Sequence, residues 1–281
     1  MSMDTFPRTE IEDLSVSRLI IGTNWFLGWS HTSRAKDRFI IDHQTLERLV
    51  PIVTTFVEAG VDTIYGVRPE SPQLQTALDE VEQSTGRRIV RMGTPHFDLS
   101  GTQEAEDEIE RTLDMFVEIG CSVCLPHQVT TDALVNRVTK RIDRMDRYVA
   151  KIRERGMIPG LSTHMPESIP YADGMDLDVG TYIQIYNAAG FLMQVEVDWV
   201  HRIIWNAKKP VITIKPLAAG RLLPLVGLAY SWATLRPQDM ICIGCLTAEE
   251  AKEVIDISIS QLERTSPQVE LQTTRSKGSL R

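Results

Sequence analysis

The feature that most constrains the fold of this chain is a unit that recurs along it: a short apolar run, a polar loop and a segment with helical spacing. The unit is clearest at 121–128, CSVCLPHQ, where an apolar run leads into Pro126 and His127. Short apolar runs of this kind are typical of buried parallel strands. Eight of them follow one another at 18–23, 61–65, 88–92, 122–125, 156–162, 180–186, 210–214 and 240–243. Eight strand–helix units predict an α/β fold, a single (β/α)8 TIM barrel.

Segments with helical spacing separate these strands. We expect helices at 43–59, 70–84, 104–118, 131–155, 196–208, 222–235 and 248–262, and a short helix flanked by prolines after the fifth strand. No Gly/Ser-rich linker interrupts the series, so residues 1–264 are predicted to form one barrel domain. The polar segment 265–281 has almost no apolar residues and is expected to be a disordered C-terminal tail.

The charge pattern argues against two classes of partner. The formal net charge is −8, and the Lys and Arg residues are scattered among Asp and Glu, so neither nucleic acid nor a membrane surface is expected as a partner. No apolar run approaches the length of about 18 residues that a membrane span needs. The N-terminus lacks the basic and apolar regions of a secretory signal. We therefore expect a cytoplasmic protein whose partner is a small-molecule substrate.

Four cysteines form two CxxC pairs, Cys121 with Cys124 and Cys242 with Cys245. This spacing also occurs in zinc and redox sites. On an extended strand, however, residues three apart point to opposite faces and do not chelate together easily. Buried, reduced thiols are therefore favoured over a metal–thiolate site.

Polar residues cluster where the predicted strands end. In a barrel of this kind the carboxyl ends of the strands converge on one mouth, where active sites lie. Three of the six histidines follow three successive strands, and His31 lies in the first loop. A single histidine would most simply cap its strand, but three at corresponding positions favour a functional site. The mouth residues predicted in this way are Asn24, Asp62, His96, His127, His164, Asn187 and Lys215.

The loop after the first strand also carries Trp25 and Trp29. These rings would form an apolar wall or a stacking platform for a sugar or another planar ligand, or else the packing of a lid. Asp62 and Lys215 would both be drawn into a partly desolvated pocket, where opposite charges compensate each other.

The order of several motifs resembles the aldo-keto reductase superfamily over most of residues 14–262. The segments that carry the resemblance are LSVSRLIIGT, GVDTIYG followed by LQTAL, LPHQ, IRERGMIPGLSTH, IKPLAAGRL and IGCLTAEEAKEVI. The resemblance implies the same barrel and, as activity, the NADP(H)-dependent reduction of a carbonyl compound.

The resemblance also implies catalytic residues, and the match is incomplete. Asp62 matches the family's aspartate and His127 its histidine. Tyr65 takes the place of the family's proton-donating tyrosine, although it lies closer to the strand. Where the family has a lysine after the third strand, this chain has TPH at 94–96. His96 or Lys215 would then have to tune the pKa of Tyr65.

On the cofactor side, the resemblance implies contacts from Asn187, Lys215 and Gly244. The eighth unit lacks an Arg or Lys near Leu246 and Thr247 that would grip a cofactor phosphate.

Three functions are compatible with these residues. The first is a divergent, nicotinamide-dependent oxidoreductase acting on a small polar carbonyl or hydroxyl compound such as a sugar. The second is a lyase, isomerase or hydrolase in which a divalent metal, Zn²⁺ or Mn²⁺, is held by His96, His127 and His164 with Asp62. The third is a non-catalytic ligand-binding barrel. Under the first reading the catalytic residues are Asp62, Tyr65, His96, His127 and Lys215, and the substrate-binding residues are Asn24, Trp25, Trp29, His164 and Asn187.

Overall fold

Eight parallel strands close into a barrel in the computed structural model, which describes residues 5–269, 274, 276 and 279. Each strand pairs with the next along the chain, and the last pairs with the first. The strands are β3 (Leu19–Gly22), β4 (Thr63–Val67), β5 (Val90–Gly93), β6 (Cys121–Cys124), β9 (Ile158–Ser162), β10 (Thr181–Ile185), β11 (Val211–Ile214) and β12 (Met240–Ile243). The predicted (β/α)8 barrel is therefore confirmed.

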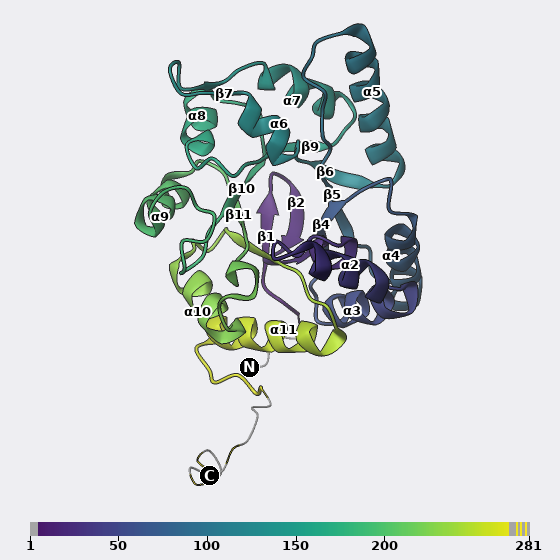
Figure 1. Ribbon diagram of the computed structural model, residues 1–281, viewed down its shortest axis with the longest axis vertical. Helices are drawn as coiled ribbons and strands as arrows, with labels where there is room; N and C mark the ends of the chain where they lie inside the picture. Colours follow the sequence, from purple (N-terminus) through teal and green to yellow (C-terminus); the bar gives the residue numbers. More distant parts are fainter. Residues whose placement is uncertain (1–4, 270–273, 275, 277–278, 280–281) are drawn as a thin grey trace.

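Helices surround the barrel (Figure 1). They are α3 (Leu46–Glu58), α4 (Pro72–Thr85), α5 (Gln103–Glu118), α7 (Met145–Glu154), the short α8 (Ser168–Gly174), α9 (Val197–Asn206), α10 (Pro224–Thr234) and α11 (Ala248–Glu263). In α5 the buried residues Ala105, Ile109, Leu113 and Phe116 recur every three or four positions, so one face of the helix packs on the sheet. The Thr102 side chain accepts a hydrogen bond from the Ala105 N–H at 3.2 Å and begins this helix.

The prediction of one long helix at 131–155 is wrong for the first half of this segment. Here the chain forms α6 (Gln128–Ala133) and a hairpin of β7 (Val135–Asn136) and β8 (Arg141–Ile142) before α7. The side-chain oxygen of Asn136 accepts hydrogen bonds from the N–H groups of Val138 and Thr139, both at 3.1 Å. This local bonding competes with helical hydrogen bonds and makes a turn.

The loop after β3 also contains helices that the sequence pattern did not indicate. They are α1 (Asn24–Leu27) and α2 (Arg34–His43), and the Ser33 side chain accepts a hydrogen bond from the Lys36 N–H to cap the second. Trp25 lies in α1 and Trp29 in the segment between the two helices, and both side chains line a cavity at the mouth of the barrel.

The amino end of the barrel is closed by a hairpin of β1 (Arg8–Ile11) and β2 (Leu14–Ser17), which lies in the middle of the ring of strands in Figure 1. Ile11 and Val16 are fully buried and join the inward-facing strand residues in one apolar core. The Ser17 N–H donates a hydrogen bond of 3.0 Å to the Thr63 hydroxyl at the base of β4. Because side chains and the hairpin fill the interior, a ligand has access to the barrel at the opposite, carboxyl end.

All four cysteines are free and buried, as predicted. Burial raises the pKa of Cys121 and of Cys242 to about 12, so both thiols stay protonated at neutral pH.

Within the described part of the chain, no helix has the length and apolar character needed to cross a membrane. The tail expected at 265–281 lies partly outside the described residues and stays a prediction.

Candidate active site

Two adjoining cavities open at the carboxyl end of the barrel. The first, which we call the histidine cavity, has a volume of about 470 Å³. It is lined by His31, His96, His127 and His164, by residues of β4, β9 and β11, and by Thr94, which follows β5. The second, which we call the α11 cavity, has a volume of about 380 Å³ and extends from β11 and β12 to the first turns of α11. Seven residues line both cavities: Thr23, Asn24, Trp29, His31, Tyr65, Ile214 and Lys215.

The geometry of β4 places Tyr65 at the junction of the two cavities. Gly66 has a φ of +93°, and a Cβ atom there would lie 2.4 Å from the Thr23 hydroxyl. Only glycine fits this position, where the pairing with β5 shifts by one residue. The Thr23 hydroxyl donates a hydrogen bond of 2.9 Å to the Gly66 carbonyl and fixes the strand end.

The Tyr65 hydroxyl lies 3.2 Å from the Ser162 hydroxyl and 3.4 Å from the Thr94 hydroxyl. Burial raises the pKa of Tyr65 above its ordinary value, although the two hydrogen bonds act in the opposite direction. Tyr65 is thus a hydrogen-bonding group at neutral pH and a weaker acid than a solvated tyrosine.

Asp62, predicted as a catalytic residue at the mouth, lies at the other end of the barrel. It precedes β4, and both of its carboxylate oxygens accept hydrogen bonds from the Arg8 guanidinium at 2.8 Å. Three residues along a strand span about 10 Å and end on the opposite face, so Asp62 and Tyr65 cannot share a site. Asp62 instead joins the N-terminal hairpin to the base of β4.

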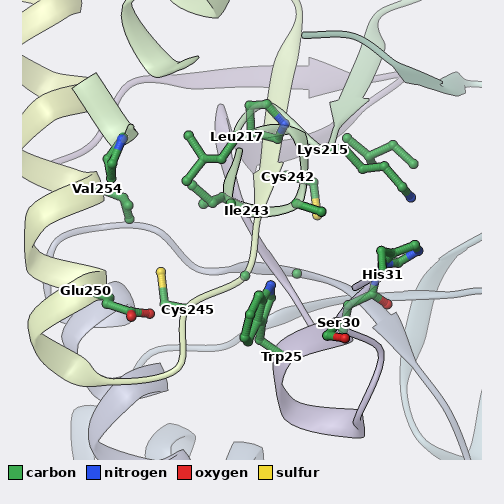
Figure 2. A pocket seen from close by; sticks show the side chains of 18 of the residues that line it. Trp25, Ser30, His31, Lys215, Leu217, Cys242, Ile243, Cys245, Glu250 and Val254 are labelled. Atoms are coloured by element: carbon green, nitrogen blue, oxygen red, sulfur yellow. The ribbon is translucent and has the colours of Figure 1, made fainter. Parts of the chain in front are cut away.

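Lys215 follows β11 and lines both cavities, at one end of the α11 cavity (Figure 2). Its backbone has a φ of +59°, which is unusual for a side chain of this size. Burial lowers the pKa of Lys215 to about 8. Its amine therefore exchanges a proton near neutral pH, as an acid–base group must.

Two of the predicted histidines stay uncharged at neutral pH. Burial, followed by the positive charges of Arg68 and Lys215 and by His96, lowers the pKa of His127 to about 4. Burial and the nearby Lys215 lower the pKa of His164 to about 3. The His127 ring also accepts a hydrogen bond of 3.4 Å from the Val129 N–H, which begins α6. Neutral imidazoles at these positions can donate or accept a hydrogen bond with a substrate oxygen.

The structure does not support the metal-binding alternative. Among the residues it describes, no group of three or more His, Cys, Asp or Glu side chains lies close enough to hold a metal ion. Asp62, the carboxylate expected to bind the metal together with the three histidines, is paired with Arg8 at the far end of the barrel.

Asn187 was predicted to contact substrate and cofactor, but it lines neither of the two cavities. It is fully buried, and its amide exchanges two hydrogen bonds with the backbone of Phe191, at 2.9 and 3.1 Å. The amide nitrogen and the amide oxygen of Asn187 thus both bond to the loop after β10 and hold it in place.

The predicted residues Asn24, Trp25, Trp29 and Gly244 all line the α11 cavity. At Gly244 a Cβ atom would lie 2.8 Å from the Trp25 ring and 3.1 Å from the Gly22 carbonyl, so the absence of a side chain lets the indole pack against β12. Trp25 lies between the two ends of this cavity in Figure 2.

Glu250 lies at the far end of the α11 cavity in Figure 2, and Glu253, one turn further along α11, also lines this cavity. The first turn of α11 is closed by its own side chains: Glu250 accepts a hydrogen bond of 2.7 Å from the Leu246 N–H, and Thr247 accepts one of 3.1 Å from the Glu250 N–H. These two N–H groups are therefore not free to bind a ligand phosphate.

Sequence reasoning missed Arg68, Ser162 and Thr94 as functional candidates, although all three line the histidine cavity. Ser162 and Thr94 could have been found from the alternation of side chains at the ends of β9 and β5. Arg68 follows a strand in an otherwise polar loop, and nothing in the sequence separates it from a surface arginine.

The architecture is shared with known barrels. No protein-family model and no curated protein matches the sequence. A putative aldo-keto reductase from Pseudomonas aeruginosa is similar in structure, with a TM-score of 0.64 and 15% identity over 92% of this chain and 98% of that one. An aldo-keto reductase from Klebsiella pneumoniae in complex with NADPH has a TM-score of 0.53 and 16% identity, over 95% and 92% of the two chains.

The structure of another type of enzyme is also similar to that of this chain. Ribulose-1,5-bisphosphate carboxylase/oxygenase from Pyrococcus horikoshii has a TM-score of 0.52 and 13% identity, over 79% of this chain and 57% of that one. At these identities the comparisons establish the architecture alone. The chain has the eight-stranded barrel fold of the aldo-keto reductases, as the order of its sequence motifs predicted.

Proposed function

We propose that this barrel is an oxidoreductase that uses a nicotinamide cofactor and acts on a small carbonyl or hydroxyl compound. The observation that carries the proposal is the junction of the two cavities, where Lys215 and Tyr65 line both. A substrate in the histidine cavity and a second ligand in the α11 cavity would meet at these two groups. Reduction of a carbonyl by hydride transfer needs the two reactants held next to each other and a group that donates a proton to the carbonyl oxygen.

The α11 cavity fits an elongated ligand with one planar apolar part. Its walls are mostly apolar, and Trp25 packs against Gly244, which follows β12, between the polar ends. In this arrangement Lys215 and His31 would hold the reactive end, and Gly244 and Trp25 would line the middle. The NADPH complex of the Klebsiella pneumoniae enzyme, on the same type of barrel, agrees with such a ligand. When bound, the reduced cofactor would supply the hydride.

Lys215 is the group we assign to proton transfer. Protonated Lys215 would donate from Nζ to the carbonyl oxygen during reduction, and the neutral amine would take the proton back during oxidation. Tyr65 and the neutral His127 would orient the same oxygen by hydrogen bonds. This division of roles replaces the Asp62-dependent arrangement that the family resemblance implied, because Asp62 does not reach the mouth.

The far end of the cavity also bears on the choice of cofactor. If the nicotinamide lies at Lys215, the adenosine lies toward Glu250 and Glu253, where no Lys or Arg is among the described residues that line the cavity. Carboxylates repel a ribose phosphate and can accept hydrogen bonds from ribose hydroxyls. NADH is therefore favoured over the NADPH that the resemblance implied.

The experiment that tests the proposed function follows NADH oxidation by absorbance with a panel of small aldehydes, ketones and 2-oxo acids. We expect turnover by the wild type, loss of about a hundredfold or more in Lys215→Met and a smaller loss in Tyr65→Phe. Lys252→Met, in which the cation lies on α11 outside both cavities, serves as the control and should retain full activity. Turnover that Lys215→Met leaves unchanged would show that this junction is not the reaction centre.

A further inference from the structure

We infer that the substrate of the histidine cavity carries an anionic group, a carboxylate or a phosphate, next to the reacting carbonyl. This inference rests on the proposed function for the carbonyl, and on the charges of the cavity for the anionic group. It replaces the neutral sugar that the polar residue types alone had indicated.

The histidine cavity is lined by cations that have no counter-charge. Arg68 and Lys215 are the two permanently or largely charged side chains in its wall, and no Asp or Glu is among the described residues that line it. Neither cation has a hydrogen bond or an ion pair with another described side chain. The cavity therefore has a net positive charge that a ligand can neutralise.

Elsewhere this protein compensates its buried cations. The guanidinium of Arg236 is 7% exposed and pairs with Asp239 at 2.7 Å, while also donating to two backbone carbonyls. Arg18 donates hydrogen bonds to the carbonyls of Arg236 and Asp239. A cation left in a cavity without such partners has a desolvation cost, and a bound anion would offset it.

The position of Arg68 suits recognition of a planar anion. Its guanidinium carbon lies over the Trp29 ring, 5.6 Å from the ring centroid, and its N–H groups donate no hydrogen bond to another described residue. The loop is held in place because the Arg68 carbonyl accepts a hydrogen bond of 3.1 Å from the Ser71 N–H. A guanidinium presents parallel N–H groups that match the two oxygens of a carboxylate or phosphate.

Both cations lie close to the imidazole that would contact the reacting oxygen. In addition to burial, the positive charges of Arg68 and Lys215 each lower the pKa of His127. Together with burial, Lys215 also lowers the pKa of His164 and of His31. A substrate with a carbonyl beside a negative group would thus place its oxygen near Lys215 and His127 while its anionic group meets Arg68. A 2-oxo acid has this shape, and so does a short phosphorylated carbonyl compound.

The test is calorimetric titration of the cofactor-free protein at pH 7 with oxalate, inorganic phosphate and, as a neutral probe, glycerol. We expect saturable binding of an anion and none of glycerol. Arg68→Gln and Lys215→Met should each weaken anion binding by about tenfold or more. Arg202→Gln is the matched control, because the Arg202 guanidinium also lies over a tryptophan ring, 5.4 Å from the centroid of Trp199, but lines neither cavity. Its affinity should equal that of the wild type.

Tighter binding of oxalate assigns the anionic group to a carboxylate, and tighter binding of phosphate assigns it to a phosphate; either result supports the inference. Absence of anion binding, or anion binding that Arg68→Gln and Lys215→Met leave unchanged, would overturn it. Arg68→Lys keeps the charge and should retain part of the affinity, which separates loss of charge from a folding defect.

A second measurement connects the anion to the reaction. If NADH oxidation is observed, pyruvate should be reduced at least about tenfold more efficiently than hydroxyacetone, its neutral counterpart. Equal efficiency would contradict the inference while leaving the proposed function intact. Anion binding without any NADH oxidation would instead contradict the proposed function.

Discussion

An amine in a partly desolvated cavity without a carboxylate holds its proton less tightly than an amine in water, and Lys215 is such a group. Several neighbouring groups have pKa values well away from neutral pH. The pKa values of His127 and His164 lie near 4 and 3, that of Cys242 near 12, and that of Tyr65 is raised by burial. Lys215 is therefore the group whose protonation should control the reaction between pH 6 and 10.

This gives a pH dependence with a definite sign. Reduction needs protonated Lys215, so kcat/KM for reduction should be constant below pH 8 and fall about tenfold per pH unit above it. Oxidation needs the neutral amine, so its kcat/KM should rise with pH and level off above about 8. Steady-state rates in both directions between pH 6 and 10 check this prediction. A Lys215→Arg variant, whose side chain does not deprotonate, should lack the break near pH 8.

The other residue-scale prediction concerns Asp62. Because Asp62 pairs with Arg8 at the base of the barrel, Asp62→Asn should leave kcat/KM within about twofold of the wild type. Loss of this partly exposed ion pair should lower the free energy of unfolding by about 0.5–1 kcal/mol. Activity assays and urea denaturation measure the two effects. A hundredfold loss of activity with unchanged stability would return Asp62 to the catalytic role that the sequence resemblance implied.

At the scale of elements, the N-terminal hairpin is part of the barrel core. Ile11 is fully buried with the inward-facing residues of the strands, so Ile11→Ala should lower the unfolding free energy by about 2–4 kcal/mol. Val138→Ala, at a side chain that is 94% exposed, should change it by less than about 0.5 kcal/mol. Urea denaturation compares the two variants. Equal stability of both would mean that the hairpin does not contribute to the core.

Helix α11 carries the prediction on cofactor choice. NADH should bind at least about tenfold more tightly than NADPH, and Glu253→Arg should shift the ratio toward NADPH by about tenfold or more. Glu249→Arg places the same charge in the first turn of α11 at an exposed residue outside the cavity, so its effect on the ratio should be much smaller. Fluorescence titration of each variant with both cofactors measures the ratio. A wild type that prefers NADPH would contradict this prediction.

The elements show what the sequence could and could not predict. Eight strands were predictable because each is an apolar run between a helical segment and a polar loop. The break of the helix expected at 131–155 was not, because it depends on local hydrogen bonds of Asn136 that apolar spacing does not report. The end of the barrel at which Asp62 lies was not predicted either, because β4 begins at Thr63, directly after Asp62, and ends beyond Tyr65.

Loop geometry limited the prediction of the site in the same way. His127, His164 and Lys215 follow strand ends in the sequence, and their side chains line the histidine cavity. Asn187 also follows a strand, but its amide bonds to the backbone of its own loop. Whether a strand-end side chain turns into the cavity or back to the loop is decided by contacts that the sequence alone does not reveal.

At the scale of the whole molecule, the architecture does not specify the reaction, because aldo-keto reductases and a carboxylase are both similar to this chain in structure. The function is therefore determined by the side chains at the mouth of the barrel. There, a cavity with apolar walls runs from Lys215 to α11, beside a second cavity that contains the histidines and the unpaired cations. We propose that the α11 cavity binds a nicotinamide cofactor.

The most direct test is an NADH titration of the wild type, Gly244→Ala and Gly174→Ala, followed by nicotinamide fluorescence. A methyl group at Gly244 would lie 2.8 Å from the Trp25 ring and displace it, whereas one at Gly174 would meet no atom within 4 Å. The account predicts saturation of the wild type at one NADH per chain, unchanged affinity in Gly174→Ala and an affinity about tenfold or more weaker in Gly244→Ala. A wild type that does not bind NADH, or equal affinities in all three proteins, would contradict it.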